Sequence, residues 1–179
     1  PFLLQMQFAF QTEKNLFIGT PFCGGGDLAS YIRAKGDKSL PQDGDELASL
    51  CLKDQRRRRV YGRLSESQTR HIAAEVILGL EHLHKHSIVY RDLKPENIFI
   101  DSSGHIKIGD YGLAKKLEEN VSQDQQRTGR VCGTRNYLPP KMLFGRLYSY
   151  EADLWSLGIM IYRMLCGAFP FEAPRSKEL

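Results

Sequence analysis

The chain has 179 residues, 41% of them hydrophobic and 26% charged, and its formal net charge at pH 7 is +4. A chain of this length and apolar content can bury a substantial core, in roughly one domain. The small positive charge does not require a polyanionic partner, and no stretch is long and apolar enough to span a bilayer.

A basic run interrupts the first third of the chain. Residues 35–45 are rich in glycine and aspartate and predict a loop, residues 46–53 could form a short helix, and Arg56–Arg59 follow. Four consecutive arginines can mark a nuclear signal, an anionic lipid surface or a nucleic-acid contact. No aromatic residues interleave the run and no nucleic-acid-binding fold surrounds it, so we favour a solvated surface insertion.

A long helix is predicted after Ser65. Ser65 and Gln68 have the spacing of a capping box, in which each side chain bonds to the backbone of the other residue. The apolar residues that follow recur at helical spacings of four, four and three: Ile72, Val76, Leu80 and Leu83. We expect this helix to run to about His86.

A hairpin is predicted downstream of the helix. Ile98–Ile100 and residues 105–108 have the patterns of two short strands, and residues 101–104 are typical of a turn. Asp110 therefore leaves the end of the hairpin and faces back toward Asn97.

The side chains around this hairpin suit phosphoryl transfer, which asks a protein mainly to position reactants and neutralise charge. Asp92 could accept or orient the proton of a hydroxyl acceptor. Lys94 follows two residues later and, in an extended loop, points the same way, where it could neutralise the transferred group. Asn97 and Asp110 supply the oxygen ligands that magnesium takes.

The string Tyr90–Asn97, followed by Asp110-Tyr111-Gly112, resembles the catalytic loop and metal-binding triplet of eukaryotic protein kinases. This resemblance implies an α+β fold of two lobes that binds ATP and Mg²⁺ and phosphorylates a serine or threonine of a protein substrate. Asp92 and Lys94 would be catalytic, and Asn97 and Asp110 would hold the metal and the nucleotide.

The resemblance covers nearly the whole chain and divides it into parts. Residues 1–20 are similar to part of the small lobe, its fourth and fifth strands, and residues 21–26 to the hinge. Residues 27–179 are similar to part of the large lobe, with the basic stretch at about 34–61 as an insertion. The nucleotide-binding residues that the resemblance implies are Thr20 as gatekeeper, Pro21 and Cys23 in the hinge, Asp27 near the ribose, Asn97, Phe99 and Asp110.

Two segments favour a protein substrate. Cys132–Tyr137 resembles the segment that receives the substrate residue, and there Thr134 would bond toward Asp92 and Lys94 as part of the catalytic site. Asp153–Gly158 resembles the start of the central buried helix of the large lobe, and residues 154–166 are apolar nearly all round. Kinases of small molecules share the fold and lack these two signatures; they remain an alternative.

A few positions indicate which group of protein kinases the chain resembles. Tyr90 in place of the usual histidine, together with Gly25–Leu28, resembles the kinases that depend on cyclic nucleotides or on calcium and lipid. Within that group, Gly79–His84 and Gly129–Val131 are most similar to the receptor kinases.

Parts of the family pattern are not found. No G-x-G-x-x-G occurs, and no lysine has the strand context of the residue that grips phosphate. The first residues are similar to the turn before the fourth strand, so we expect a fragment of a longer parent that transfers little phosphate in isolation. A pseudokinase or scaffold, which binds partners without turnover, is the alternative from another class.

Four positions depart from the family. Lys141 replaces a glutamate that usually pairs with an arginine, and Tyr111 adds a hydroxyl that needs a partner. Arg130 stands where many relatives carry an activating phosphothreonine. Arg163 stands where relatives that prefer basic substrates place an acid, so we do not expect that preference here in spite of Glu96.

The expected partners follow from this interpretation. They are ATP and a protein with a serine or threonine acceptor, without nucleic acid. We expect a monomer in the cytoplasm; peripheral membrane contact and a nuclear location stay open because of the arginine run.

Overall fold

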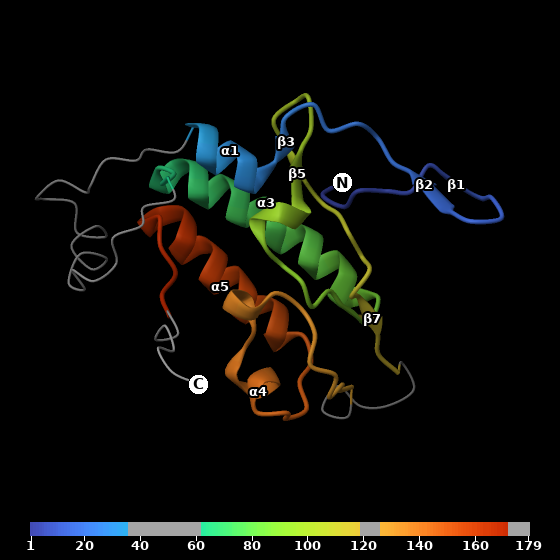
Figure 1. Cartoon of the computed structure of the whole chain (residues 1–179). Helices are drawn as coiled ribbons and strands as arrows, with labels where there is room; N and C mark the ends of the chain where they lie inside the picture. The colour runs from blue at the N-terminus through green and yellow to red at the C-terminus, as the bar shows by residue number, and fades with distance from the viewer. Residues whose placement is uncertain (36–61, 119–125, 172–179) are drawn as a thin grey trace, which may run out of the picture.

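The computed structural model describes residues 1–35, 62–118 and 126–171 (Figure 1). The predicted helix at 46–53 and the run Arg56–Arg59 lie outside the described residues. Within the described ranges the helices are α1 (Leu28–Lys35), α3 (Glu66–Lys85), α4 (Pro140–Leu143) and α5 (Glu151–Cys166), with 3₁₀ turns η1 (Pro95–Asn97) and η2 (Arg135–Tyr137). The strands are β1 (Phe8–Gln11), β2 (Leu16–Gly19), β3 (Gly26–Asp27), β4 (Ile88–Val89), β5 (Ile98–Ile100), β6 (Ile106–Ile108) and β7 (Lys115–Lys116).

Helix α3 begins where the sequence predicts. Gln68 N donates to Ser65 Oγ at 3.2 Å and Ser65 N donates to Gln68 Oε1 at 3.0 Å, so both halves of the capping box are formed. The predicted apolar stripe faces the core: Val76, Leu80 and Leu83 are buried, and Ile72 is partly buried and packs against the same core cluster. The helix ends just before the expected His86, which serves as its C-cap.

An antiparallel sheet in the order β3-β5-β6 contains the predicted hairpin, and its strand β6 packs against α3. A Cβ at Gly79 would lie 2.7 Å from Ile108 Cδ1, so a glycine lets the helix and the strand approach this closely. Glu75 of α3 is buried, and its carboxylate accepts a hydrogen bond from Ile106 N at 2.9 Å and lies 2.6 Å from His105 Nδ1. The helix therefore fixes the position of the hairpin.

Strands β1 and β2 form an antiparallel hairpin that projects away from the helices (Figure 1). Both strands lie within residues 1–20, and their assignment as the fourth and fifth strands of a small lobe stays a prediction. The rings of Phe10 and Phe17 stack across the pair with their centroids 4.7 Å apart. The large apolar side chains of this region are exposed: Met6, Phe8, Phe10, Leu16, Phe17 and Ile18. The buried core consequently lies in the helical part of the molecule.

Helix α5 packs against α3 and η2. Its residues Met160 and Met164 are fully buried in the core, whereas Leu154 is 56% exposed. Residues 154–166 are apolar nearly all round, as the sequence shows, but the helix they form is not covered at Leu154. Among the described elements, α3 and η2 cover only part of its circumference.

The mixture of helices and short antiparallel strands confirms the predicted α+β class. None of the described helices combines the length and the apolar character needed to cross a membrane.

Candidate active site

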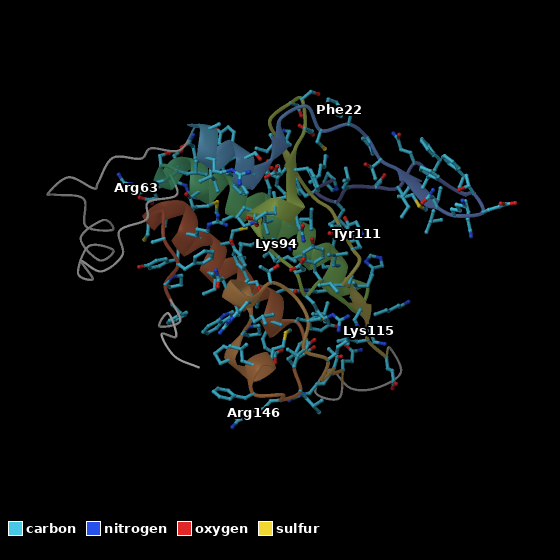
Figure 2. The ribbon with its side chains drawn as sticks, in the orientation of Figure 1. Phe22, Arg63, Lys94, Tyr111, Lys115 and Arg146 are labelled. Atoms are coloured by element: carbon cyan, nitrogen blue, oxygen red, sulfur yellow. The ribbon has the colours of Figure 1, made fainter. Side chains whose placement is uncertain are left out.

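Three side chains form a closed hydrogen-bonded triangle at the predicted catalytic position. Lys94 Nζ donates to Asp92 Oδ2 and to Thr134 Oγ1, each at 2.8 Å, and Thr134 Oγ1 donates to Asp92 Oδ1 at 2.8 Å. Asp92 is buried and Lys94 is partly exposed, so solvent reaches the triangle at the lysine. Figure 2 shows Lys94 near the centre of the molecule. The structure thus brings together the three predicted catalytic residues.

Asn97 completes this arrangement from η1. Its Nδ2 donates to the backbone oxygen of Asp92 at 2.9 Å and to Asp92 Oδ2 at 3.0 Å. The turn that places it starts at Pro95, whose fixed φ suits the first helical position, and closes with a bond from Asn97 N to Lys94 O at 3.0 Å. Both carboxylate oxygens of Asp92 are therefore held by donors.

A buried aspartate of α5 holds the catalytic loop from the other side. Asp153 is fully buried. Its carboxylate accepts hydrogen bonds from Tyr90 N at 2.9 Å and from Arg91 N at 2.8 Å. The same carboxylate lies 2.8 Å from His84 Nε2. Arg91 has a φ of 69°, a conformation that costs a residue other than glycine about 1–2 kcal/mol. The Asp153 carboxylate stabilises this conformation directly before Asp92.

The side chain of Arg91 joins the loop to two later segments. Its Nε donates to Leu113 O at 2.7 Å and its Nη1 to Tyr148 Oη at 3.4 Å. The Tyr148 hydroxyl in turn donates to the backbone oxygen of Arg130. Gly133 has a φ of 106°, and a Cβ there would lie 2.6 Å from Arg91 O, so the glycine allows the two segments to approach closely.

Two tyrosines beside the loop are hydrogen-bonded to the end of the hairpin. The Tyr90 hydroxyl donates to Gly109 O, and the Tyr111 hydroxyl donates to Ile108 O at 2.6 Å. Burial raises the pKa of Tyr111 to about 12. The added hydroxyl of Tyr111 therefore has the partner that the sequence analysis expected it to need, and both tyrosines remain protonated donors at neutral pH.

Asp110 follows Gly109 at the end of the hairpin and is exposed to solvent. Gly109 N donates to Asn97 O at 2.9 Å, which sets the hairpin end against the catalytic loop. Burial raises the pKa of Tyr90, and the nearby charges of Asp92 and Asp110 raise it further. The charges of both carboxylates therefore act on the Tyr90 hydroxyl.

Two of the residues predicted near the nucleotide, Asp27 and Phe99, lie at the junction of β3 and β5. Asp27 pairs with Phe99 in the antiparallel register. The Asp27 carboxylate accepts Ser30 N at 2.8 Å and Ser30 Oγ at 2.7 Å, and so caps α1. Partial burial raises the pKa of Asp27, but the hydrogen bonds from Ser30 outweigh it and the pKa is lowered overall.

The predicted hinge residues lie on the segment between β2 and β3. Thr20 and Pro21 are exposed, and Cys23 is partly buried. The backbone turns there through a bond from Gly26 N to Cys23 O at 3.1 Å. Their contacts with a nucleotide stay predictions.

Asn97 and Asp110 carry oxygen atoms of the type that magnesium binds, and their role as its ligands stays a prediction. Across the described ranges, no group of three or more histidine, cysteine, aspartate and glutamate side chains gathers as a metal site. Magnesium instead binds through one or two protein oxygens together with substrate phosphates. Because the amide nitrogen of Asn97 donates to Asp92, its carbonyl oxygen is the atom that can serve a cation.

Comparison with known proteins decides the family. The family model described as the protein kinase domain matches residues 1–179. The chain belongs to this family.

The kinase domain is 36% identical over 181 residues to the serine/threonine-protein kinase sck1 of Schizosaccharomyces pombe, a match that covers 100% of this chain and 22% of that protein. It is 38% identical over 171 residues to the cAMP-dependent protein kinase catalytic subunit of Dictyostelium discoideum, a match that covers 96% of this chain and 21% of that protein. It is 36% identical over 179 residues to the protein kinase C delta type of Rattus norvegicus, a match that covers 100% of this chain and 22% of that protein. The kinase domain thus spans about a fifth of the length of these relatives.

These relatives confirm the prediction of a serine/threonine-type domain from the group that includes cyclic-nucleotide-dependent kinases and protein kinase C. The closer resemblance to receptor kinases stays a prediction.

Lys141, which replaces the usual glutamate, finds a carboxylate in the kinase domain. Its Nζ lies 3.1 Å from Glu151 Oε1, and Glu151 Oε2 accepts Ser149 N at 3.1 Å. Both side chains of the ion pair are about half exposed, so the pair contributes at most about 1 kcal/mol. It links α4 to the first turn of α5.

Sequence reasoning missed the residues that hold the site from outside the motifs. Asp153 was assigned only to the start of a core helix, His84 only to a segment that resembles the receptor kinases, and Glu75 and Tyr148 were not singled out. One signal in the sequence pointed to such a residue: Asp153 lies in the first turn of a strongly apolar helix. A carboxylate that is buried there needs hydrogen-bond donors.

Proposed function

We propose that this kinase domain transfers the γ-phosphoryl group of ATP to a serine or threonine hydroxyl of a protein substrate. The triangle of Asp92, Lys94 and Thr134, with Asn97 bonded to the same carboxylate, carries the proposal. It places a proton acceptor and a cation within 2.8 Å of each other, and the cation is partly exposed to solvent. That is the arrangement that phosphoryl transfer to a hydroxyl requires.

The step assigns a role to each side chain. The acceptor hydroxyl oxygen attacks the γ-phosphorus, the bond from that phosphorus to the β,γ-bridging oxygen breaks, and ADP leaves. The hydroxyl proton passes to the carboxylate of Asp92 and then to solvent. The ammonium group of Lys94 neutralises negative charge on the transferred group, and Thr134 keeps both side chains in place.

The nucleotide would bind where the hinge meets β5. Thr20, Pro21 and Cys23 would face the adenine, Asp27 the ribose, and Phe99 the base from the large-lobe side. The register of Asp27 opposite Phe99 supports this grouping. Asn97 and Asp110 would hold Mg²⁺, which supplies neutralisation of the phosphate charges when it is bound.

Peptide phosphorylation tests the proposal. The chain, alone and extended by any residues that its coding sequence adds on either side, is incubated with radiolabelled ATP, Mg²⁺ and an array of serine and threonine peptides. We expect labelling that falls about 10³-fold when Asp92 is changed to asparagine, because the proton acceptor is lost. Asp101→Asn is the matched control: the same chemical change at a turn aspartate outside the site should leave labelling unchanged.

Two outcomes would contradict the proposal. One is labelling that survives in the Asp92→Asn variant, which would place the chemistry elsewhere. The other is binding of ATP, measured by calorimetry, without phosphate transfer by the chain alone or by the extended chain. That second result would favour the pseudokinase alternative.

A further inference from the structure

Residues 126–150 contain no acidic residue and five cationic ones: Arg127, Arg130, Arg135, Lys141 and Arg146. All five are exposed, and their summed charge exceeds the net charge of +4 that the whole chain carries. Lys141 is paired at 3.1 Å with Glu151, which follows this segment in α5. Most of the excess charge therefore lies on the arginines, and this part of the kinase domain presents a positive surface to solvent.

Two of the arginines lie close together because two parts of the segment run side by side. Thr128 N donates to Tyr148 O at 2.9 Å, and Tyr148 N donates to Thr128 O at 3.0 Å, which forms an antiparallel bridge. In an antiparallel pair, the residues two positions away at the same end of the bridge are Arg130 and Arg146. The two arginines consequently belong to one region of the surface.

Three large apolar side chains are exposed in the same region. Leu143, the last residue of α4, is 57% exposed, Phe144 directly after it is 75% exposed, and Leu147 is 57% exposed. A Cβ at Gly129 would lie 3.2 Å from Leu147 Cδ2, so Leu147 lies against the segment that bears the first arginines. Helix α4 stands at an edge of the molecule (Figure 1), and Arg146 points away from the other elements there (Figure 2).

A bilayer that contains anionic lipids matches both properties of this surface. Its negative headgroups attract Arg130 and Arg146, and its acyl chains accept apolar side chains that project from an edge of the protein, as Leu143 and Phe144 do. A nucleic acid would also attract the arginines, but it would leave the exposed leucines without an apolar partner. The combination of charge and projecting apolar groups therefore favours a lipid surface.

We propose that residues 127–131 and 141–147 form a membrane-contact surface that binds anionic phospholipid bilayers. Arg130 and Arg146 lie at the headgroups in this arrangement, and Leu143 and Phe144 enter the layer between headgroups and acyl chains. The surface is separate in sequence from the run Arg56–Arg59. Binding to it does not depend on phosphate transfer.

Co-sedimentation with lipid vesicles tests the proposal. The kinase domain, with any residues that its coding sequence adds on either side, is mixed with vesicles of phosphatidylcholine, with or without phosphatidylserine, at several salt concentrations. We expect binding to the vesicles that contain phosphatidylserine and weaker binding to phosphatidylcholine alone. The binding should fall as the salt concentration rises, because salt screens the attraction between arginines and headgroups.

Two double variants separate the contributions of charge and of apolar insertion. Arg130→Gln/Arg146→Gln should lower the partition coefficient about 30-fold, since each cation near an anionic surface contributes roughly fivefold. Leu143→Ser/Phe144→Ser keeps the net charge and should lower it roughly tenfold or more, because the inserted apolar area is lost. All four side chains are exposed, so both variants should fold, which urea denaturation checks.

The matched control is Arg33→Gln/Arg70→Gln. It removes two exposed arginines from α1 and α3, so the net charge falls by the same amount while the proposed surface stays intact. The control should bind vesicles nearly as well as the wild type. Every one of these variants retains the run Arg56–Arg59, so that run cannot account for a difference among them.

Three results would overturn the proposal: no binding to either kind of vesicle, unchanged binding in either surface variant, or a loss in the control as large as that in Arg130→Gln/Arg146→Gln. A DNA duplex and a polyglutamate peptide are tested alongside the vesicles. If one of these binds through Arg130 and Arg146 while the vesicles do not, the partner is a different polyanion and the proposal fails.

Discussion

Replacing Asp153 by asparagine changes one atom of a fully buried side chain that receives two backbone amides of the catalytic loop. The carboxylate offers an oxygen to Tyr90 N and another to Arg91 N, whereas an amide keeps one oxygen and turns its NH₂ group toward the second donor. A hydrogen bond to a charged group contributes about 1.5–3 kcal/mol, and a buried donor left unsatisfied costs about 1–3 kcal/mol. We therefore expect Asp153→Asn to lower the free energy of unfolding by about 3 kcal/mol.

The measurement is urea denaturation at pH 7, followed by the fluorescence of Trp155, the chain's one tryptophan, which lies on the same helix. Glu81→Gln is the control, because it makes the same change from carboxylate to amide on an exposed part of α3 and should stay close to wild type. If Asp153→Asn destabilises the protein no more than this control, Asp153 does not hold the loop as we argue.

Three further predictions concern the backbone, a hydroxyl and a helix cap. Gly133→Ala should cost more than about 2 kcal/mol in a thermal or urea melt, because its φ of 106° is strained for alanine and the new Cβ would meet Arg91 O at 2.6 Å; a neutral result would contradict the close approach. Tyr111→Phe should cost only about 0.5–1 kcal/mol, since the carbonyl of Ile108 also accepts a backbone amide; a larger loss would show that the hydroxyl has a second role. Asp27→Ala should cost about 1 kcal/mol at pH 7 through loss of the cap. Because the pKa of Asp27 is lowered in the folded protein, the wild type's advantage over this variant is complete above about pH 4 and is lost as the pH falls through the lowered pKa; an advantage that persists at lower pH would point to packing instead.

Local sequence rules predicted the elements whose cause is local. The capping box at Ser65 and the apolar stripe of α3 depend on residues three or four positions apart, and both are formed. The catalytic motif could be read because Asp92, Lys94 and Asn97 lie within a few residues of one another. Thr134 could be assigned only through the resemblance, since it lies 40 residues beyond Lys94.

The interactions that hold the site could not be predicted in the same way. Asp153 meets Tyr90 across 63 residues, and Glu75 meets Ile106 across 31, so each pairing exists only after the helices have packed. No spacing rule connects such positions. The exposure of Leu154 was missed for a related reason: an apolar residue pattern shows that a helix can be buried, while the neighbouring elements decide which face is covered.

The backbone amides of Tyr90 and Arg91 donate to Asp153 of α5, so they can report on whether the site is assembled. Their hydrogens can exchange with solvent deuterium only when Asp153 separates from the loop or the domain opens more widely. The exchange rate at these positions therefore measures how often the molecule visits a disassembled site. A nucleotide that binds only the assembled site would slow both amides by the factor 1 + [L]/Kd, without touching either one.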